Sequence, residues 1–109
     1  MRRGEIWLVE FATPAETGEP AKTRPALIVS ADRFNRTRSP TVVVVPLTTA
    51  ARGHPLHVEI DAAGLAAASS AQTELVGVVS RRRLVRHLAD VDQLVMAEVS
   101  ALLATLLDI

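Results

Sequence analysis

A chain of 109 residues, of which 49% are apolar and whose net charge is zero at pH 7, has the size of one domain with a modest core. We therefore expect a single domain over residues 1–109. The absence of cysteine excludes a disulfide framework, a thiolate metal site and a cysteine nucleophile. No apolar segment approaches the roughly 20 residues that span a bilayer, so we expect a cytoplasmic protein.

The cationic residues are unusually rich in arginine, which makes up eleven of the twelve. Residues 22–57 carry several arginines against the single acid Asp32, and Arg81–Arg83 form a second basic group. The guanidinium fork binds phosphate bidentately and stacks on bases, so this bias favours a polyanionic partner on one face of the protein. A coding sequence that prefers arginine to lysine is the alternative explanation.

The first predicted strand, Glu5 to Phe11, alternates between two faces. The segment from Ala12 to Thr23 has no apolar periodicity and is long for a loop in so small a domain, which is typical of binding loops. The next strand is predicted from Arg24 to Ser30. Pro25 has no backbone N–H, so this pair of residues must lie at the start of a strand or on an edge. The Arg24 guanidinium is therefore expected at the rim of a sheet.

The segment from Ala31 to Arg38 is predicted to form a helical turn, with Ser30 or Asp32 as its cap. The β-branched run within Thr41 to Thr49 predicts a central strand that is buried on both faces. Pro46 cannot donate to a ladder, so strand pairing is expected to break or bulge just before Leu47.

The remaining chain is predicted to contain two more strands, Leu56 to Ile60 and Leu75 to Val79, separated by an irregular link over Asp61 to Ser70. A short basic turn from Arg81 to Leu88 follows, with Ser80 as its cap.

The clearest predicted helix is the last segment, Leu94 to Leu107, with Asp90 or Asp92 as its N-cap. Its apolar stripe is wider than one small barrel can cover, and an exposed patch of that kind would be a liability. The predicted fold class is mainly β: five or so antiparallel strands in a small barrel, a short helix, and a C-terminal helix that closes one end.

The only metal-like motif is a His-x-x-His pair, His54 and His57, which is interrupted by Pro55 and enters a strand. No third ligand lies near it in the sequence, so we expect neither a metal nor another cofactor. A Gly-rich phosphate loop and a serine elbow are also absent from the sequence.

The polar residues that remain suit a phosphodiester. Arg24 offers a cation for the charge that develops at phosphorus, Thr48 and Thr49 place hydroxyls where the sheet opens, and Glu74 is a carboxylate for proton transfer. With RNA, whose own 2'-hydroxyl can be the nucleophile, such a set needs no metal.

Four segments resemble the MazF/PemK (Kid-like) toxins of bacterial toxin-antitoxin modules, and the resemblance covers essentially the whole chain. The segments are Arg3-Gly4-Glu5-Ile6-Trp7-Leu8-Val9, Lys22-Thr23-Arg24-Pro25-Ala26-Leu27-Ile28-Val29-Ser30, Val42-Val43-Val44-Val45-Pro46-Leu47-Thr48, and the helix end from Leu102 to Ile109. The resemblance implies a small SH3-like antiparallel barrel with a C-terminal helix.

The resemblance also implies site residues. Arg24 matches the family's arginine at the scissile phosphate, and Thr48 matches the threonine beside it. Glu74 stands at the family's carboxylate position, but it is followed by Leu75 where many members have glutamine. Some relatives also use an arginine just before the carboxylate and a histidine in the first loop; the nearest positions in this chain hold Gln72 and Gly18. The predicted catalytic residues are Arg24, Thr48 and Glu74, and the predicted RNA contacts are Lys22, Thr23, Thr49, Arg52, Gln72, Arg81, Arg82 and Arg83.

The implied function is a toxin of a type II toxin-antitoxin module that cleaves single-stranded RNA at short motifs without the ribosome. Metal-independent chemistry that leaves a 2',3'-cyclic phosphate is expected, as are a homodimer and a cognate MazE/PemI-like antitoxin. Two alternatives stay open: a gyrase-poisoning toxin like the related CcdB proteins, and a catalytically impaired relative that only binds RNA.

Overall fold

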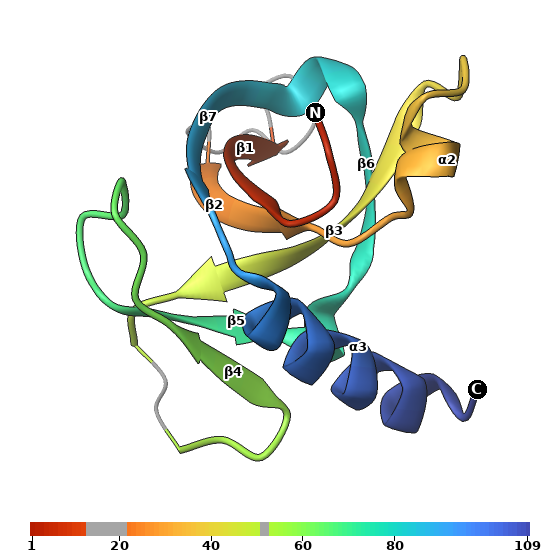
Figure 1. Ribbon diagram of the computed structural model, residues 1–109. Helices are drawn as coiled ribbons and strands as arrows, with labels where there is room; N and C mark the ends of the chain where they lie inside the picture. The colour runs from red at the N-terminus through yellow and green to blue at the C-terminus, as the bar shows by residue number, and fades with distance from the viewer. Residues whose placement is uncertain (13–21, 51–52) are drawn as a thin grey trace.

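Seven antiparallel strands and a C-terminal helix form the framework of the described part of the chain, which comprises residues 1–12, 22–50 and 53–109 of a computed structural model (Figure 1). The elements are β1 (Glu5–Ala12), β2 (Lys22–Ile28), α2 (Asp32–Asn35), β3 (Thr41–Thr48), β4 (His57–Ile60), β5 (Ser69–Gln72), the 3₁₀ turn η1 (Thr73–Leu75), β6 (Gly77–Ser80), the 3₁₀ turn η2 (Arg81–Arg83), β7 (Leu84–Asp90) and α3 (Gln93–Leu107).

The sheet curls until its two ends approach each other. Its strand order is β4-β5-β3-β2-β1-β7, and β6 also pairs with β3. The loop after β4 reaches the strand at the other end of this order, because a Cβ on Gly64 would lie only 2.0 Å from the carbonyl oxygen of Leu88 in β7. Gly64 also has a φ of +101°, which favours glycine. The predicted small antiparallel barrel with a C-terminal helix is thus confirmed.

The central strand, β3, changes its neighbour at Pro46. On one side it pairs with β6 through Thr41–Val44 and then with β5 through Leu47 and Thr48. On the other side it pairs with β2, and Pro46 lies opposite Ala26. A proline has no N–H for a second ladder, so the exchange of partners falls where the sequence predicted an interruption.

Both faces of β3 are buried, as its run of valines predicted. Val42 and Val44 belong to one buried cluster together with Val9, and Val45 and Leu47 belong to a larger one that includes Val99 of α3. Alternation along the strand separates the two sets. The sheet therefore has a core on each side of its central strand, and any polar site must lie where these clusters end.

The C-terminal helix begins as predicted, with Asp92 as its N-cap. The Asp92 carboxylate accepts a hydrogen bond from the backbone N–H of Val95 at 2.9 Å. The helix contacts β4 and η1, and its C-terminal half extends beyond the sheet (Figure 1). Only Val99 is fully buried in it, whereas Leu94 is 77% and Leu107 54% exposed. No helix within the described ranges combines the length and the apolar character needed to cross a membrane.

The first helical turn has a different cap from the predicted one. Its N-cap is Ala31, which offers no side-chain bond. Ser30 instead donates to Asn35, and Asp32 accepts the backbone N–H of Arg3 at 2.7 Å. That hydrogen bond from Arg3 is the main reason why the pKa of Asp32 lies below its usual value. Both candidate caps therefore serve other contacts, and Asp32 ties the N-terminal segment to α2.

Two strands were missing from the sequence prediction. β5 falls in the segment Asp61 to Ser70 and just after it, and its Ser-Ser-Ala-Gln sequence has neither β-branched residues nor alternation. β7 occupies most of the predicted basic turn, of which only Arg81–Arg83 is a turn, capped by Ser80 as expected. The strand predicted at Leu75 begins instead at Gly77, because η1 occupies the residues before it.

Candidate functional site

Arg24 lies where β2 loses one of its two neighbours. The strand begins two residues earlier than predicted, so Arg24 is its third residue and pairs with Val9 of β1. On the other side, the pairing with β3 extends only to Ala26. Pro25, which cannot donate a hydrogen bond, thus occupies a one-sided position. The sheet opens beside the Arg24 side chain, as the sequence predicted.

Among the described residues, the Arg24 guanidinium is held by neutral groups. Its Nη2 donates to the carbonyl oxygen of Leu47 at 3.1 Å and to Oε1 of Gln72 at 2.6 Å. Within the described part of the chain, no carboxylate pairs with Arg24, and its Nε and Nη1 have no hydrogen-bond partner. The cation is therefore fixed in position while no described residue compensates its charge, which is the state that an anion-binding arginine requires.

Thr48 ends β3 beside Arg24. Its Oγ1 accepts the backbone N–H of Ala50 at 3.2 Å, which fixes the turn that follows the strand and leaves the hydroxyl proton available to a ligand. A hollow of about 200 Å³ opens at this point. It is lined by Arg24, Pro25, Leu47, Thr48, Thr49 and Ser69. The hollow is the place where an anion could meet both the guanidinium and the hydroxyl.

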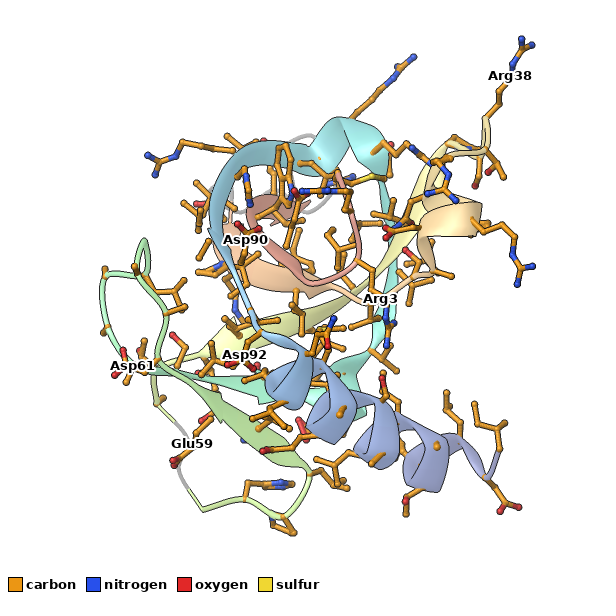
Figure 2. The ribbon with its side chains drawn as sticks, in the orientation of Figure 1. Arg3, Arg38, Glu59, Asp61, Asp90 and Asp92 are labelled. Carbon is orange, nitrogen blue, oxygen red and sulfur yellow. The ribbon has the colours of Figure 1, made fainter. Side chains whose placement is uncertain are left out.

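Strand register extends this site across the sheet. Thr48 lies opposite Ser70, and Ser70 lies opposite Glu59 of β4, so these side chains share one face. Gln72 follows on the same face and is paired with His57. Figure 2 shows Glu59 on β4, where its side chain is exposed. The face that holds Arg24 therefore carries a continuous polar strip from β2 to β4.

Glu74 lies on η1 and contacts histidine rather than Arg24. Its Oε1 lies 2.8 Å from Nε2 of His57, and its Oε2 lies 3.9 Å from Nδ1 of His54. Gln72 is therefore the link between the two parts of the site, since it bonds Arg24 and pairs with His57.

The sequence argument against a metal at His54 and His57 rested on the lack of a nearby third ligand. In space, however, Glu74 reaches both histidines, although it lies 17 positions after His57 in the sequence. His57 is therefore a site residue that the sequence pattern alone did not indicate. The alternation of β4, in which His57 and Glu59 face away from the buried Val58 and Ile60, is the signal that could have identified it.

The other predicted RNA contacts lie at several places. Lys22 and Thr23 are exposed at the start of β2, and Thr49 is exposed at the rim of the hollow. Arg52 and Gly18 lie outside the described residues.

Arg82 and Arg83 line a separate hollow of about 290 Å³ beside Ser80 and Glu10. The Arg24 hollow and this second hollow lie on the same face of the sheet. Val9 of β1 pairs with Arg24 of β2 and also with Leu84, which follows η2, and paired residues point to the same face.

The side chains of Arg81 and Arg83 contact other parts of the fold. Nη1 of Arg83 donates to the carbonyl oxygen of Glu10 at 3.2 Å, and Nη1 of Arg81 lies 4.0 Å from the Met1 sulfur. Arg82 is exposed between them, and Ser80 accepts its backbone N–H. The three predicted contacts therefore form a basic edge next to β1 rather than a part of the Arg24 hollow.

Known proteins of one family match this chain over nearly its whole length. A family model described as "PemK-like, MazF-like toxin of type II toxin-antitoxin system" matches residues 2–107. Endoribonuclease MazF9 of Mycobacterium tuberculosis is 35% identical, and the match covers 100% of this chain and 98% of that protein. Endoribonuclease PemK of Escherichia coli is 37% identical, with 98% of this chain and 82% of that protein covered.

Solved structures with the same fold include toxins alone and in complexes. The crystal structure of MazF (Form-I) from Deinococcus radiodurans has a TM-score of 0.80 at 27% identity and covers 100% of this chain and 97% of that one. A MazE-MazF crystal structure (Form-II) from the same organism has a TM-score of 0.77 at 28% identity, with 98% and 94% covered. An endoribonuclease in complex with its cognate antitoxin from a mycobacterial species has a TM-score of 0.78 at 25% identity, with 100% and 96% covered.

Proposed function

Because the chain belongs to the PemK-like and MazF-like toxins of type II toxin-antitoxin systems, we propose that it is an endoribonuclease that cleaves single-stranded RNA at short sequence motifs without the ribosome. The observation that carries this proposal is the Arg24 guanidinium, which is fixed by neutral partners among the described residues, at a hollow shared with Thr48. Such a pair of groups fits the scissile phosphate of a polynucleotide.

The proposed chemistry uses the RNA itself as the source of the nucleophile. The substrate's 2'-oxygen loses its proton and attacks the adjacent phosphorus, the bond from phosphorus to the 5'-oxygen breaks, and the departing 5'-oxygen takes up a proton from water. The products are a 2',3'-cyclic phosphate and a 5'-hydroxyl. Arg24 faces the negative charge that develops on the non-bridging oxygens, and Thr48 adds one neutral hydrogen bond. The protein's task is then to align the reacting atoms and to stabilise charge, and no metal is required for it.

Proton transfer is assigned to Glu74. Its carboxylate is the acidic group of η1, and its bond to His57 places it on the element that follows Gln72, the residue that holds Arg24. Glu74 accepts the proton of the 2'-hydroxyl, and His57 fixes the orientation of the carboxylate. This assignment differs from the sequence hypothesis only in that it adds His57.

Partners follow from the same reasoning. The complexes of related toxins with their antitoxins support binding of this chain to a cognate antitoxin, whose acidic and apolar tail would cover the Arg24 hollow. We also expect a homodimer that acts on RNA in the cytoplasm. The related endoribonucleases favour this function over a gyrase-poisoning toxin, and the fixed Arg24 favours it over a relative that only binds RNA.

The decisive experiment incubates the purified protein with a long synthetic RNA in EDTA and maps the 5' ends of the fragments. We expect discrete fragments that carry a 5'-hydroxyl and a 2',3'-cyclic phosphate, and no cleavage of an all-DNA copy. An RNA with a single 2'-deoxy residue at the mapped position should resist cleavage there only. A strict requirement for divalent metal, or a 3'-hydroxyl product, would contradict the proposal.

A further inference from the structure

His54, His57 and Glu74 converge between the segment that enters β4 and the 3₁₀ turn η1. One potential ligand atom from each residue lies within 4.8 Å of the other two. The two imidazole rings are stacked, with centroids 4.2 Å apart and planes inclined by 20°. The arrangement brings two nitrogen donors and one carboxylate to a single point, although the third residue is 17 positions away from His57 in the sequence.

Two polar atoms of this cluster are buried and have no hydrogen-bond partner among the described residues. They are Oε2 of Glu74 and Nδ1 of His57, and the His57 side chain is only 5% exposed. A buried carboxylate oxygen without a donor carries an uncompensated desolvation cost. A cation beside Oε2 would remove that cost, and Nδ1 of His54, at 3.9 Å from Oε2, is the nearest nitrogen that could share the cation.

The protonation pattern of His54 agrees with a ligand role. The backbone N–H of Leu56 donates to Nδ1 of His54 at 3.1 Å, so this nitrogen is the unprotonated one and its single lone pair is directed at that N–H. A metal would take the place of that single N–H contact. Neutral imidazole is the form that binds transition metals.

We propose that His54, His57 and Glu74 form a Zn²⁺ site. Two histidines and a glutamate are a donor set of zinc sites that leave a fourth position open, whereas Mg²⁺ and Ca²⁺ prefer sites made of oxygen ligands. The bound ion links His54 and His57, at the entry to β4, with Glu74 on η1. Zinc acts here as a regulator, because the proposed cleavage needs no metal.

One consequence rests on the proposed function. Glu74 is the assigned proton acceptor, and a zinc ion that binds its carboxylate would occupy the lone pairs used for proton transfer. Zinc is therefore expected to slow RNA cleavage, and EDTA to restore it. Zinc binding itself does not depend on this assignment.

Calorimetry of the full chain, treated with EDTA and dialysed, tests the site with ZnCl₂ as the only ligand. We expect one ion per chain and a melting temperature that rises with the zinc concentration. His54→Ala is the first variant, because the His54 side chain is 45% exposed and its loss leaves the core intact. Loss of a ligand should exceed the roughly 10- to 100-fold cost of losing a group outside the ligand shell, so zinc affinity should fall at least that far.

The matched control uses the second histidine and carboxylate cluster of the described chain. Glu5, His87 and Asp90 also lie within ligand range of one another, but His87 and Asp90 are exposed. His87→Asn should leave zinc affinity unchanged, and Glu74→Gln should reduce it as His54→Ala does.

Three results would overturn the inference: no saturable zinc binding, equal binding by the wild type, His54→Ala and Glu74→Gln, or loss of binding in His87→Asn. If zinc binds as expected while no condition yields RNA cleavage, the proposed function fails and the zinc site stands. If the RNA is cleaved but zinc does not bind, the zinc site fails and the proposed function stands.

Discussion

Gln72 and Arg24, which are 48 positions apart in the sequence, meet at 2.6 Å, where Nη2 of the arginine donates to Oε1 of the glutamine. The bond joins the end of β5 to β2 across the end of β3. A neutral acceptor fixes the guanidinium without cancelling its charge, and the bond is therefore a positioning device for the cation rather than an ion pair.

Gln72→Leu should lower turnover more than it weakens RNA binding. The leucine keeps a side chain of similar length but releases Arg24, and a misplacement of about 1 Å can cost on the order of 100-fold in rate. Single-turnover cleavage and RNA titration separate the two effects. Gln72→Glu provides the contrast, because its carboxylate would neutralise Arg24 and should weaken RNA binding first. A Gln72→Leu enzyme with wild-type turnover would show that Gln72 does not position Arg24.

Arg24→Ala should reduce cleavage by roughly 100-fold or more, the loss that accompanies removal of a donor to developing charge in other enzymes. Arg24→Lys should also fail, because an ammonium group cannot reproduce the planar fork. The control is Arg38→Ala, since Arg38 extends away from the fold into solvent (Figure 2). This variant should cleave RNA at the wild-type rate. Near wild-type turnover of Arg24→Ala would remove the basis of the mechanism.

Thr48→Val should lose less activity than Arg24→Ala. A neutral hydrogen bond contributes about 1 kcal/mol, which corresponds to roughly 5-fold in rate. Thr48→Ser keeps the hydroxyl that caps Ala50 and should retain most of the activity. Rates of the two variants, compared at saturating RNA, distinguish the hydroxyl from the methyl group. Equal losses in both variants would mean that packing, and not the hydrogen bond, sets the effect.

The positions of Arg24 and Thr48 could be predicted from the sequence because each lies next to a proline or shortly after one. Pro25 and Pro46 remove backbone donors, and a missing donor limits strand pairing whatever the rest of the fold does. The burial of β3 and the Asp92 cap were likewise local properties of strong patterns. These features needed no knowledge of distant neighbours.

The partners of those residues could not be predicted in this way. Gln72 reaches Arg24 only because Ser69–Gln72 forms a strand, and that strand is held by its neighbours and not by its own composition. Glu74 meets His57 only because η1 turns the chain back after β5. β7 could not be recognised as a strand because it directly follows three arginines, and because the exposed residues in its middle form no apolar face. Tertiary pairing decided each of these cases.

The basic edge formed by Arg81, Arg82 and Arg83 should contribute affinity rather than cleavage specificity. Replacing all three by glutamine should weaken RNA binding and lower the slope of log affinity against log salt, by up to about 0.7 for each lost phosphate contact with a single strand. The cleavage positions should not change, because these residues lie outside the Arg24 hollow.

A matched control replaces Arg33, Arg36 and Arg38 by glutamine. These exposed arginines lie on and after α2, before the start of β3, whereas Thr48 is at the end of that strand. The same change in net charge should therefore have little effect on binding at moderate salt. A new cleavage motif in the Arg81–Arg83 variant would assign base readout to this edge and contradict the prediction.

The apolar surface of α3 should hold two copies of the chain together. Leu107 is 54% and Ile109 88% exposed at the end of a helix whose C-terminal half extends beyond the sheet, and an uncovered patch of this kind favours association. Replacing Leu106 and Leu107 together by lysine should convert a dimer into a monomer at micromolar concentration, as measured by light scattering. The helix should still form, because its Asp92 cap and the buried Val99 are untouched.

Val85→Lys on β7 removes another exposed apolar side chain and should leave the dimer intact. A wild-type protein that is monomeric under these conditions, or a Val85 variant that alone dissociates, would exclude α3 as the contact.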